Sequence, residues 1–369
     1  MPDTHQTVLE INLGALEHNY RFLRSKIDPS TKFMGVVKAS GYGSDPLVIA
    51  RKLVALEVDA LAVAYTSEGV HLRKGGIECP ILVLHPQEIN FKELISYCLE
   101  PSLYSYKILK SFHKIAREAF QEKYPVHLKF NTGLNRLGFW ENDISHIKKE
   151  IEDSDFLKIK GIFSHLGASE DLSEKEFTLS QIKTFEAIVV EAERALGPIP
   201  IKHLLNTSGI LNYPKAQWNM VRSGIGIYGY GNDTKYESSL RPVASLKTII
   251  SQLHRIEPGE TVGYNRAFKA DGYRITATLP LGHADGIGRQ YGNEKASVLV
   301  KGKRAPIIGN VCMDMLMIDV TGIDCAEGDE VIIFGEGQSA EQFASFAGTI
   351  SYELLTGLAS RIPRLYTEY

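Results

Sequence analysis

Cysteine is scarce in this sequence of 369 residues. The four cysteines (Cys79, Cys98, Cys312 and Cys325) show no CxxC spacing. They therefore predict reduced thiols in a cytoplasmic protein rather than a disulfide framework or a zinc ribbon. The eleven histidines include no HExxH pair, so the sequence predicts no metal site.

Several other features are absent. The sequence has no apolar run of about eighteen residues and no basic and apolar leader at its start, which argues against a membrane span and a signal peptide. The net charge is -3, without a basic stripe or tail, so nucleic acid and anionic membranes are not expected as partners. There is no GxxxxGK[ST] loop, so no ATP-dependent ligase activity is expected.

What the sequence does contain is a long alternation of short apolar runs and amphipathic stretches over its first 240 residues. An apolar run of this kind is typical of a parallel strand that is buried on both faces. We count eight such runs, at residues 33–38, 60–64, 80–84, 100–104, 126–130, 157–163, 199–205 and 220–225. Eight strands that alternate with helices predict an α/β protein with a (β/α)8 TIM-type barrel over residues 1–240.

The pattern changes at residue 241. Helical periodicity almost disappears, and alternating runs separated by turns such as Glu257-Pro258-Gly259-Glu260 predict a mostly β domain over residues 241–369. Residues 8–11 alternate like a strand ahead of the first helix. Residues 1–11 are therefore assigned either to the barrel domain or to packing with the C-terminal domain.

Polar residues follow the predicted barrel strands, where the active sites of such barrels lie. The first predicted strand ends in Lys38, and Tyr42 lies in the glycine-rich loop that follows. Later strand ends contribute Lys129, Arg136, His165, Asn206, Thr207, Ser208, Arg222, Gly224 and Ile225. A strand-end lysine is more often only solvated, and His165 alone could be a hydrogen-bonded core residue. Because all of these residues follow strands of the same predicted barrel, we expect them to form a single binding site.

This set of residues suits pyridoxal 5'-phosphate, a phosphorylated aromatic aldehyde. Lys38 would form the Schiff base with the aldehyde. Tyr42, Thr207, Ser208 and the backbone amides around Gly224 and Ile225 would hold the phosphate, since the last two loops of such barrels often do so.

Arg222 would face the ring nitrogen. Its guanidinium keeps its proton, so the ring stays a weak electron sink, and return of a proton to the substrate Cα is favoured over transamination.

With these motifs in order, the chain resembles the bacterial alanine racemases over nearly its full length. The matching segments are Leu9-Glu10-Ile11-Asn12, Val37-Lys38-Ala39, Gly41-Tyr42-Gly43, Thr132-Gly133 with Arg136-Leu137-Gly138, Arg222-Ser223-Gly224-Ile225 with Tyr228-Gly229, Val311-Cys312-Met313-Asp314, and Arg361-Ile362-Pro363-Arg364. The resemblance implies a pyridoxal-phosphate isomerase that interconverts L- and D-alanine by a two-base mechanism and supplies D-alanine for peptidoglycan.

The resemblance also implies residue roles. Lys38 carries the cofactor and is the base on one face of the amino acid substrate, and Tyr264 is the base on the other. In that family this tyrosine comes from the partner subunit, which implies a homodimer with shared active sites. Arg136 and the backbone amide of Met313 would hold the substrate carboxylate. Lys129 aligns with a lysine that is often carbamylated in the family and that steadies the arginine corresponding to Arg136. His165 would lie behind Arg222.

Three positions depart from the family pattern. Asn131 stands where many members have aspartate, and His283 and Ser360 stand where many have tyrosines that narrow or shape the pocket. The departures leave a broader-specificity amino-acid racemase as an alternative. A pyridoxal-phosphate decarboxylase is a further alternative, but it would usually place a carboxylate where Arg222 stands. Single-barrel pyridoxal-phosphate carriers lack the β domain that is expected here.

Overall fold

Eight parallel strands close a barrel in sequence order, from β2 to β9, with β9 paired to β2. The computed structural model describes residues 6–152, 154–231, 234–236 and 238–368. The barrel strands are β2 (Lys32–Val36), β3 (Ala60–Val63), β4 (Ile81–Val83), β5 (Glu100–Leu103), β6 (Tyr124–Lys129), β7 (Leu157–Phe163), β8 (Ile201–His203) and β9 (Met220–Ser223). The expected TIM-type barrel is confirmed.

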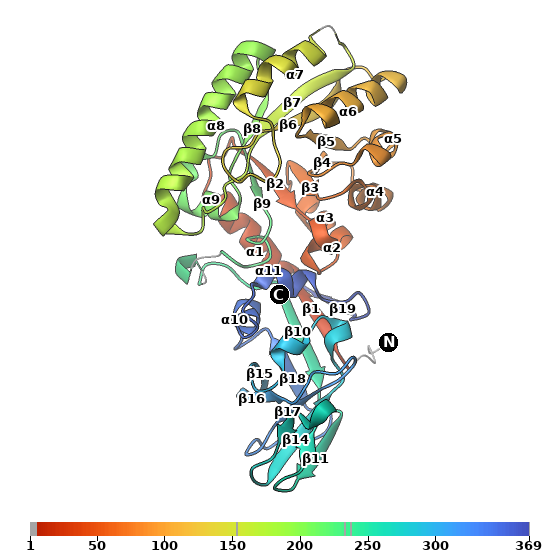
Figure 1. The fold of residues 1–369 in the computed structure, drawn as a ribbon, viewed down its shortest axis with the longest axis vertical. Coiled ribbons are helices and arrows are strands. Elements are labelled where there is room, and N and C mark those ends of the chain that lie inside the picture. Colours follow the sequence, from red (N-terminus) through yellow and green to blue (C-terminus); the bar gives the residue numbers. More distant parts are fainter. Residues whose placement is uncertain (1–5, 153, 232–233, 237, 369) are drawn as a thin grey trace. The chain divides into compact units, whose positions relative to one another are not determined.

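One helix precedes the first barrel strand, and the others follow the strands and surround the barrel (Figure 1). They are α1 (Leu13–Arg24), α2 (Lys38–Tyr42), α3 (Pro46–Ala55), α4 (Thr66–Lys74), α5 (Phe91–Ser96), α6 (Tyr106–Glu118), α7 (Ile144–Ile151), α8 (Lys175–Leu196) and α9 (Thr207–Asn212). Helix α6 shows why these segments are helical. Ser105 caps it by accepting a hydrogen bond from the Ile108 amide at 3.3 Å, and Ile108, Phe112 and Ala116 recur on its buried face.

A second sheet is built from nine strands in the order β11-β14-β17-β16-β15-β18-β10-β1-β19. Its strands are β1 (Val8–Asn12), β10 (Ala244–Ile249), β11 (Gln252–Ile256), β14 (Arg274–Leu279), β15 (Ser297–Val300), β16 (Lys303–Ile308), β17 (Leu316–Asp319), β18 (Glu330–Phe334) and β19 (Arg364–Thr367). The same domain also contains a separate hairpin of β12 (Thr261–Val262) and β13 (Phe268–Lys269) and the helices α10 (Ala340–Ser345) and α11 (Ser351–Thr356). The expected mostly β C-terminal domain is confirmed.

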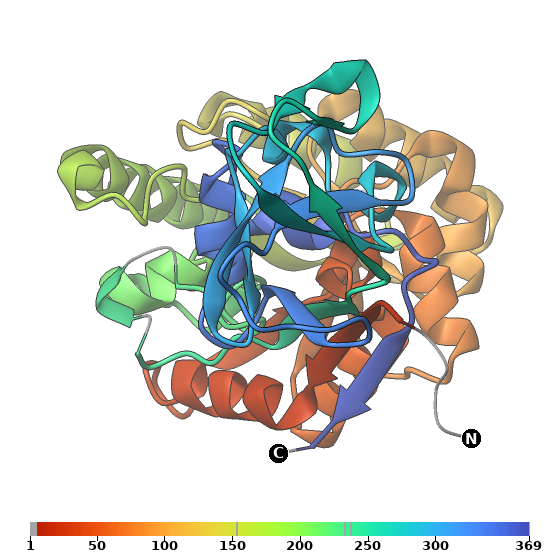
Figure 2. The same cartoon turned by 90° about the horizontal axis from the view of Figure 1, so that it is seen from below.

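The two ends of the chain meet in this second sheet. Strand β1 pairs antiparallel with β10 and parallel with β19, and Figure 2 shows the red β1 beside the blue β19. The chain divides into two compact units. One contains residues 1–16, 42–45 and 242–369, and we call it the β unit; the other contains residues 17–41 and 46–241, and we call it the barrel unit.

The two sheets differ in burial in the way that their topology requires. Every residue of β3, β4 and β5 is buried, because barrel strands are covered on both faces. Strand β10 instead alternates between buried and half-buried residues. None of the helices that the structure describes is both long and apolar enough to cross a membrane.

Candidate active site

Lys38 does not end a strand, as the sequence suggested, but begins a left-handed turn. Strand β2 stops at Val36, and the next residues after Lys38 have positive φ angles: 52° at Ala39, 55° at Ser40 and 62° at Gly41. A left-handed turn costs L-residues about 1–2 kcal/mol each. Such backbone strain persists where the surrounding structure holds it, often at functional sites.

Glu68 of α4 supports this turn. Its carboxylate accepts hydrogen bonds from the Ala39 amide at 2.7 Å and from the Ala64 amide at 2.6 Å. Desolvation, together with the charge of Arg136, lowers the pKa of Lys38, although Glu68 acts in the opposite direction. A lower pKa favours the neutral amine, which is the form that attacks an aldehyde.

Lys129 ends β6 and is buried, with its ammonium 5.9 Å from the centre of the Phe163 ring. Burial is the main cause that lowers its pKa to about 8, and neighbouring cations add to the effect. These cations are Arg136, Arg222 and Lys38. The carboxyl ends of the barrel strands therefore gather four cationic side chains.

Arg222 of β9 is buried, and five polar contacts fix its guanidinium. Nη1 donates to Nδ1 of His203 at 2.7 Å, and Nη2 contacts Nδ1 of His165 at 3.3 Å. The remaining contacts are with the backbone carbonyls of His203, Ser164 and Leu204. Among the described residues, no hydrogen bond is formed by Nε. Burial lowers the pKa of Arg222 to about 9, so it stays charged at neutral pH.

His165 follows β7 and is uncharged at neutral pH. Desolvation, followed by the charges of Arg222 and Arg136, lowers its pKa well below the usual range. A neutral imidazole can accept a hydrogen bond from the guanidinium through its unprotonated nitrogen.

Asn131 organises the loop that carries Arg136. Its Oδ1 accepts from the amides of Gly133 at 3.1 Å and Asn135 at 3.0 Å, while its Nδ2 donates to Oδ1 of Asn135 at 2.8 Å. An aspartate could not make the last bond with an asparagine oxygen, because it has no N–H. Arg136 itself is exposed.

The residues after β8 and β9 form a compact turn. Asn206 caps α9 by accepting from the Gly209 amide at 2.9 Å. The hydroxyl of Thr207 contacts that of Ser223 at 2.9 Å and accepts from the Gly226 amide at 3.2 Å. The side chains of Asn206 and Thr207 therefore support the local structure. The sequence predicted cofactor binding for these residues and did not indicate this structural role.

The backbone amides of Gly224 and Ile225 lie at the start of the turn that follows β9. Ile227 donates to the Gly224 carbonyl at 2.8 Å and Tyr228 donates to the Ile225 carbonyl at 3.0 Å. Gly224 and Ile225 therefore begin a helical turn, and amides at such a start have no partner within the turn. Together with Ser208 at the start of α9 they offer anion-binding groups.

The remaining predicted site residues belong to the β unit. Tyr42 is buried there, with its ring centre 6.2 Å from that of Tyr352. Burial raises the pKa of Tyr42, so its hydroxyl keeps its proton. Tyr264 and Met313 are 72% and 60% exposed, and both line one hollow of about 600 Å³ on this unit.

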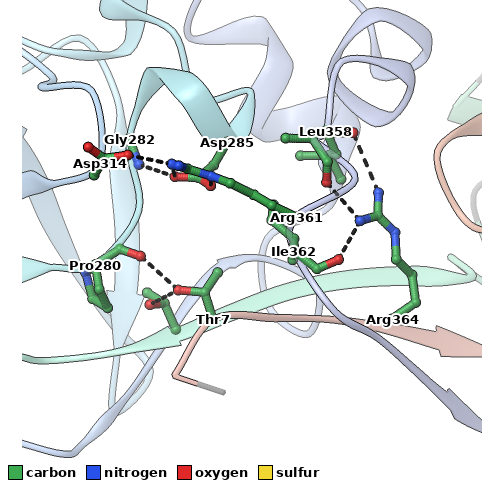
Figure 3. A network of polar contacts seen from close by, with 11 residues as sticks. Thr7, Pro280, Gly282, Asp285, Asp314, Leu358, Arg361, Ile362 and Arg364 are labelled. Carbon is green, nitrogen blue, oxygen red and sulfur yellow. Dashed lines mark hydrogen bonds and ion pairs between the residues drawn. The ribbon is translucent and has the colours of Figure 1, made fainter. Parts of the chain in front are cut away.

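Arg361 forms a clamp with Asp285 and Asp314 (Figure 3), and Asp314 directly follows Met313 in the sequence. Arg361 donates to both carboxylate oxygens of Asp285, at 2.6 and 3.0 Å, and to Asp314 at 2.7 Å. The amide of Ala284 also donates to the Met313 carbonyl at 2.9 Å. Paired charges and backbone bonds thus hold the backbone on both sides of Met313.

Comparison with known proteins assigns the whole chain to one family. Residues 11–232 match the alanine racemase N-terminal domain, and residues 243–366 match the alanine racemase C-terminal domain. The chain belongs to the alanine racemase family.

Individual relatives agree with this assignment. Alanine racemase 1 of Clostridium acetobutylicum is 36% identical over 97% of this chain and 94% of its own length. The alanine racemase structure from Clostridium difficile 630 superposes with a TM-score of 0.92 at 34% identity, covering 99% of this chain and 97% of that one. The Bartonella henselae alanine racemase with covalently bound pyridoxal phosphate gives a TM-score of 0.90 at 26% identity, covering 98% of this chain and 100% of that one.

The family predicted from the sequence motifs is therefore confirmed, together with its two-part architecture. The matches do not support the decarboxylase alternative. Sequence reasoning missed His203, Phe163 and Glu68, which hold the predicted residues in place. Phe163 ends the run predicted at 157–163, so its position next to the site was a usable signal, whereas His203 lies inside the run predicted at 199–205.

The buried charge of Lys129 gives a testable effect on stability. Its pKa falls from 10.5 to about 8 on folding, so the unfolded chain binds more protons between these pH values. The cost of the buried charge is complete below pH 8 and is relieved as the pH rises through this window. In cofactor-free protein without CO₂, Lys129→Met should raise the free energy of unfolding at pH 7 by roughly 2 kcal/mol.

The matching measurement is urea denaturation at a series of pH values. Lys129→Met should also remove part of the gain in stability between pH 8 and 10. The control is Lys110→Met, because Lys110 is exposed on α6. A Lys129→Met protein that is less stable than the parent at pH 7 would contradict the assignment of a buried, uncompensated charge.

Proposed function

We propose that this chain interconverts L- and D-alanine with pyridoxal 5'-phosphate as its cofactor, and that it supplies D-alanine for peptidoglycan. The observation that carries the proposal is the cluster of Lys38, Lys129, Arg136 and Arg222 at the carboxyl ends of the barrel strands, in a chain of the alanine racemase family. We further place the reaction in the cytoplasm, which the unpaired cysteines support.

The chemistry of these residues fits the cofactor. Four neighbouring cations require anionic ligands, and the cofactor phosphate and the substrate carboxylate are anionic. The amides of Gly224 and Ile225, with Thr207 and Ser208, would hold the phosphate, and Tyr42 remains a predicted donor to it. Asn206 would act through its cap on α9. When bound, the cofactor withdraws electrons from the substrate and makes its Cα proton acidic enough to remove.

Arg222 would then face the ring nitrogen through Nε. Its other donors are already engaged, as described above, and His165 and His203 prevent the guanidinium from rotating. Because Arg222 keeps its own proton, the ring nitrogen is not protonated by it. This favours return of the proton to Cα over transamination.

Two bases are needed to invert the configuration at Cα. Lys38 would hold the cofactor and move the proton on one face of the substrate, and its lowered pKa helps its amine to accept a proton. Tyr264 would serve the other face. Arg136 and the Met313 amide would bind the substrate carboxylate, and Lys129, carbamylated or not, would steady Arg136.

We also propose a homodimer in which each active site takes Tyr264 and Met313 from the partner subunit. Their exposure side by side in a single hollow of the β unit supports this arrangement, because contiguous exposed apolar surface often marks an interaction site.

A direct test is incubation of the cofactor-loaded protein with L-alanine alone. D-alanine should appear and approach the amount of L-alanine, as detected with a D-amino-acid oxidase assay, and the same end point should be reached from D-alanine. Formation of an amine and CO₂ without D-alanine would instead support a decarboxylase.

The substrate range is a separate prediction. His283 and Ser360 are exposed on the β unit and replace two tyrosines that are frequent in the family. Pocket size discriminates by about 1–3 kcal/mol per methylene, so a wider pocket should accept L-serine and L-2-aminobutyrate within roughly tenfold of alanine in kcat/KM. The double variant His283→Tyr with Ser360→Tyr should reduce kcat/KM for these substrates more than for alanine. Turnover of alanine alone by the parent enzyme would refute the prediction.

A further inference from the structure

A row of hydrogen bonds crosses the barrel interior from Arg222 to the opposite mouth. Nη1 of Arg222 lies 2.7 Å from Nδ1 of His203, and Nε2 of His203 lies 3.2 Å from Nδ1 of His127. Nε2 of His127 lies 3.0 Å from Oε2 of Glu100, and Oε1 of that carboxylate accepts from Nζ of Lys160 at 2.5 Å. We call these five residues the barrel relay.

The relay ends at the amino ends of the strands. Glu100 is the first residue of β5, and it lines a small cavity of about 40 Å³ together with His127 and Lys160. Residues Lys32 and Met220, which begin β2 and β9, line the same cavity. The relay therefore joins the mouth that holds the predicted active site to the other mouth of the same barrel.

The chemistry of the two ends fixes the direction of every bond. A guanidinium only donates, so Nδ1 of His203 accepts and the ring proton of His203 lies on Nε2. That proton is donated to Nδ1 of His127, whose own proton then lies on Nε2 and is donated to Glu100. A carboxylate only accepts, so the series ends there without a conflict.

Packing holds both imidazole rings in these positions. The ring of Phe163 stacks on His203 with 4.6 Å between centres and 10° between planes, and the Arg222 guanidinium lies 5.3 Å from the same ring. Gly161 makes room for His127, because a Cβ at this glycine would lie 2.4 Å from Nδ1 of that histidine. The rings therefore cannot easily turn to another hydrogen-bond partner.

Glu100 also supplies the negative charge that Arg222 lacks nearby. Among the described residues, the polar contacts of Arg222 are with carbonyl oxygens and imidazole nitrogens, and none is a carboxylate. Burial opposes the ionisation of Glu100, but its bonds with His127 and Lys160 lower its pKa below the usual value. The relay thus connects a buried cation to an ionised carboxylate.

We propose that Glu100 and His127 are positioning residues for the cofactor site, which set the tautomer of His203 and thereby the orientation of Arg222. Without the carboxylate, His127 can carry its proton on Nδ1, which faces the N–H of His203. His203 must then move its own proton to Nδ1, where it opposes the guanidinium. The expected effect on catalysis rests on the proposed function. The tautomers of His127 and His203 do not, because they depend only on the hydrogen bonds within the chain.

The first test needs no substitution and no substrate. In cofactor-free protein labelled with ¹⁵N-histidine, NMR at pH 7 should show His127 and His203 as neutral rings with the proton on Nε2. A proton on Nδ1 of His203, or a doubly protonated ring, would overturn the proposal. This readout is independent of racemase activity, so its failure is distinct from failure of the proposed function.

The second test compares three variants of strand β5. Glu100→Leu should move the His203 signals away from the Nε2–H pattern, shift the absorption maximum of the bound cofactor, and lower kcat about tenfold with little change in KM. Glu100→Gln keeps an oxygen acceptor and should stay within about threefold of the parent. Ser102→Ala is the matched control, because this buried hydroxyl has no hydrogen-bond partner among the described residues.

The outcomes of these tests show whether Glu100 and His127 position the cofactor site or only fill the interior of the barrel. A folded Glu100→Leu protein with unchanged His203 signals, cofactor spectrum and kcat would show that the relay only fills the barrel. If Glu100→Leu does not fold, Gly161→Ala tests the relay from strand β7. The added Cβ would meet Nδ1 of His127 and displace this ring from its bonds with His203 and Glu100, so the His203 signals should shift as well. An unchanged His203 tautomer in Gly161→Ala with a displaced His127 would contradict the proposal.

Discussion

Replacing Lys38 with alanine should lower racemisation by at least about 10³-fold, because the change removes both the covalent attachment of the cofactor and one of the two proposed bases. The variant should also lose the visible absorption band of the lysine-linked cofactor. Borohydride treatment of the parent should fix the cofactor to the peptide that contains Lys38, and mass spectrometry should find it there. A Lys38→Ala protein that still carries a borohydride-reducible cofactor would refute the assignment.

The control for this experiment is a lysine outside the site. Lys110 is exposed on α6, and Lys110→Ala should keep the absorption band and the activity. The left-handed turn after Lys38 makes a further comparison useful. Because alanine has no long side chain to place, Lys38→Ala should leave the turn and its bonds to Glu68 intact, so thermal unfolding should change little.

The barrel could be predicted because its signal is repeated. Eight buried strands give eight separate apolar runs, and an error of a few residues in one of them does not change the count. Strand β7 occupies the range that the sequence indicated, whereas β8 is shorter by two residues at each end. These ends depend on ladder hydrogen bonds to neighbours distant in sequence, which local patterns do not report.

The left-handed turn could not be predicted in the same way. Ala39 and Ser40 have no intrinsic preference for positive φ, and only Gly41 hints at it. The carboxylate of Glu68, which is far away in the sequence, supports the turn. The sequence therefore singled out Lys38 as the candidate lysine but placed it at a strand end.

The barrel relay shows a similar limit. Histidines within apolar strands are easily taken as isolated core residues, as His165 could be. His127 precedes Lys129 by two residues, and alternate residues of a strand point to the same side. Only the closed barrel brings β5, β6, β8 and β9 close enough for their side chains to form a row.

Tyr264 is the residue whose replacement should separate the two faces of the reaction. Tyr264→Phe removes a phenolic proton donor and acceptor without changing the ring. Removal of a general base costs about 10²–10⁴-fold, and here the loss should affect Cα proton exchange from one enantiomer much more than from the other. The measurement is deuterium incorporation from D₂O into L- and D-alanine.

Tyr273→Phe is the matched control, since Tyr273 is also exposed on the β unit, at 68% of its surface. It should exchange both enantiomers like the parent enzyme. Equal loss for L- and D-alanine in Tyr264→Phe, or no loss, would contradict a base that acts on one face.

Combining the two inactive variants tests whether the site is shared between subunits. In a mixed dimer of Lys38→Ala and Tyr264→Phe chains, a shared architecture places both defects in one site and leaves the other site intact. Half of the dimers in a statistical mixture are mixed, so activity should recover to about a quarter of the parent value. If each site draws both residues from one chain, every site keeps a defect and no activity returns. Chains with different affinity tags, purified over both columns, should raise the recovery to about half, because every dimer then holds one intact site.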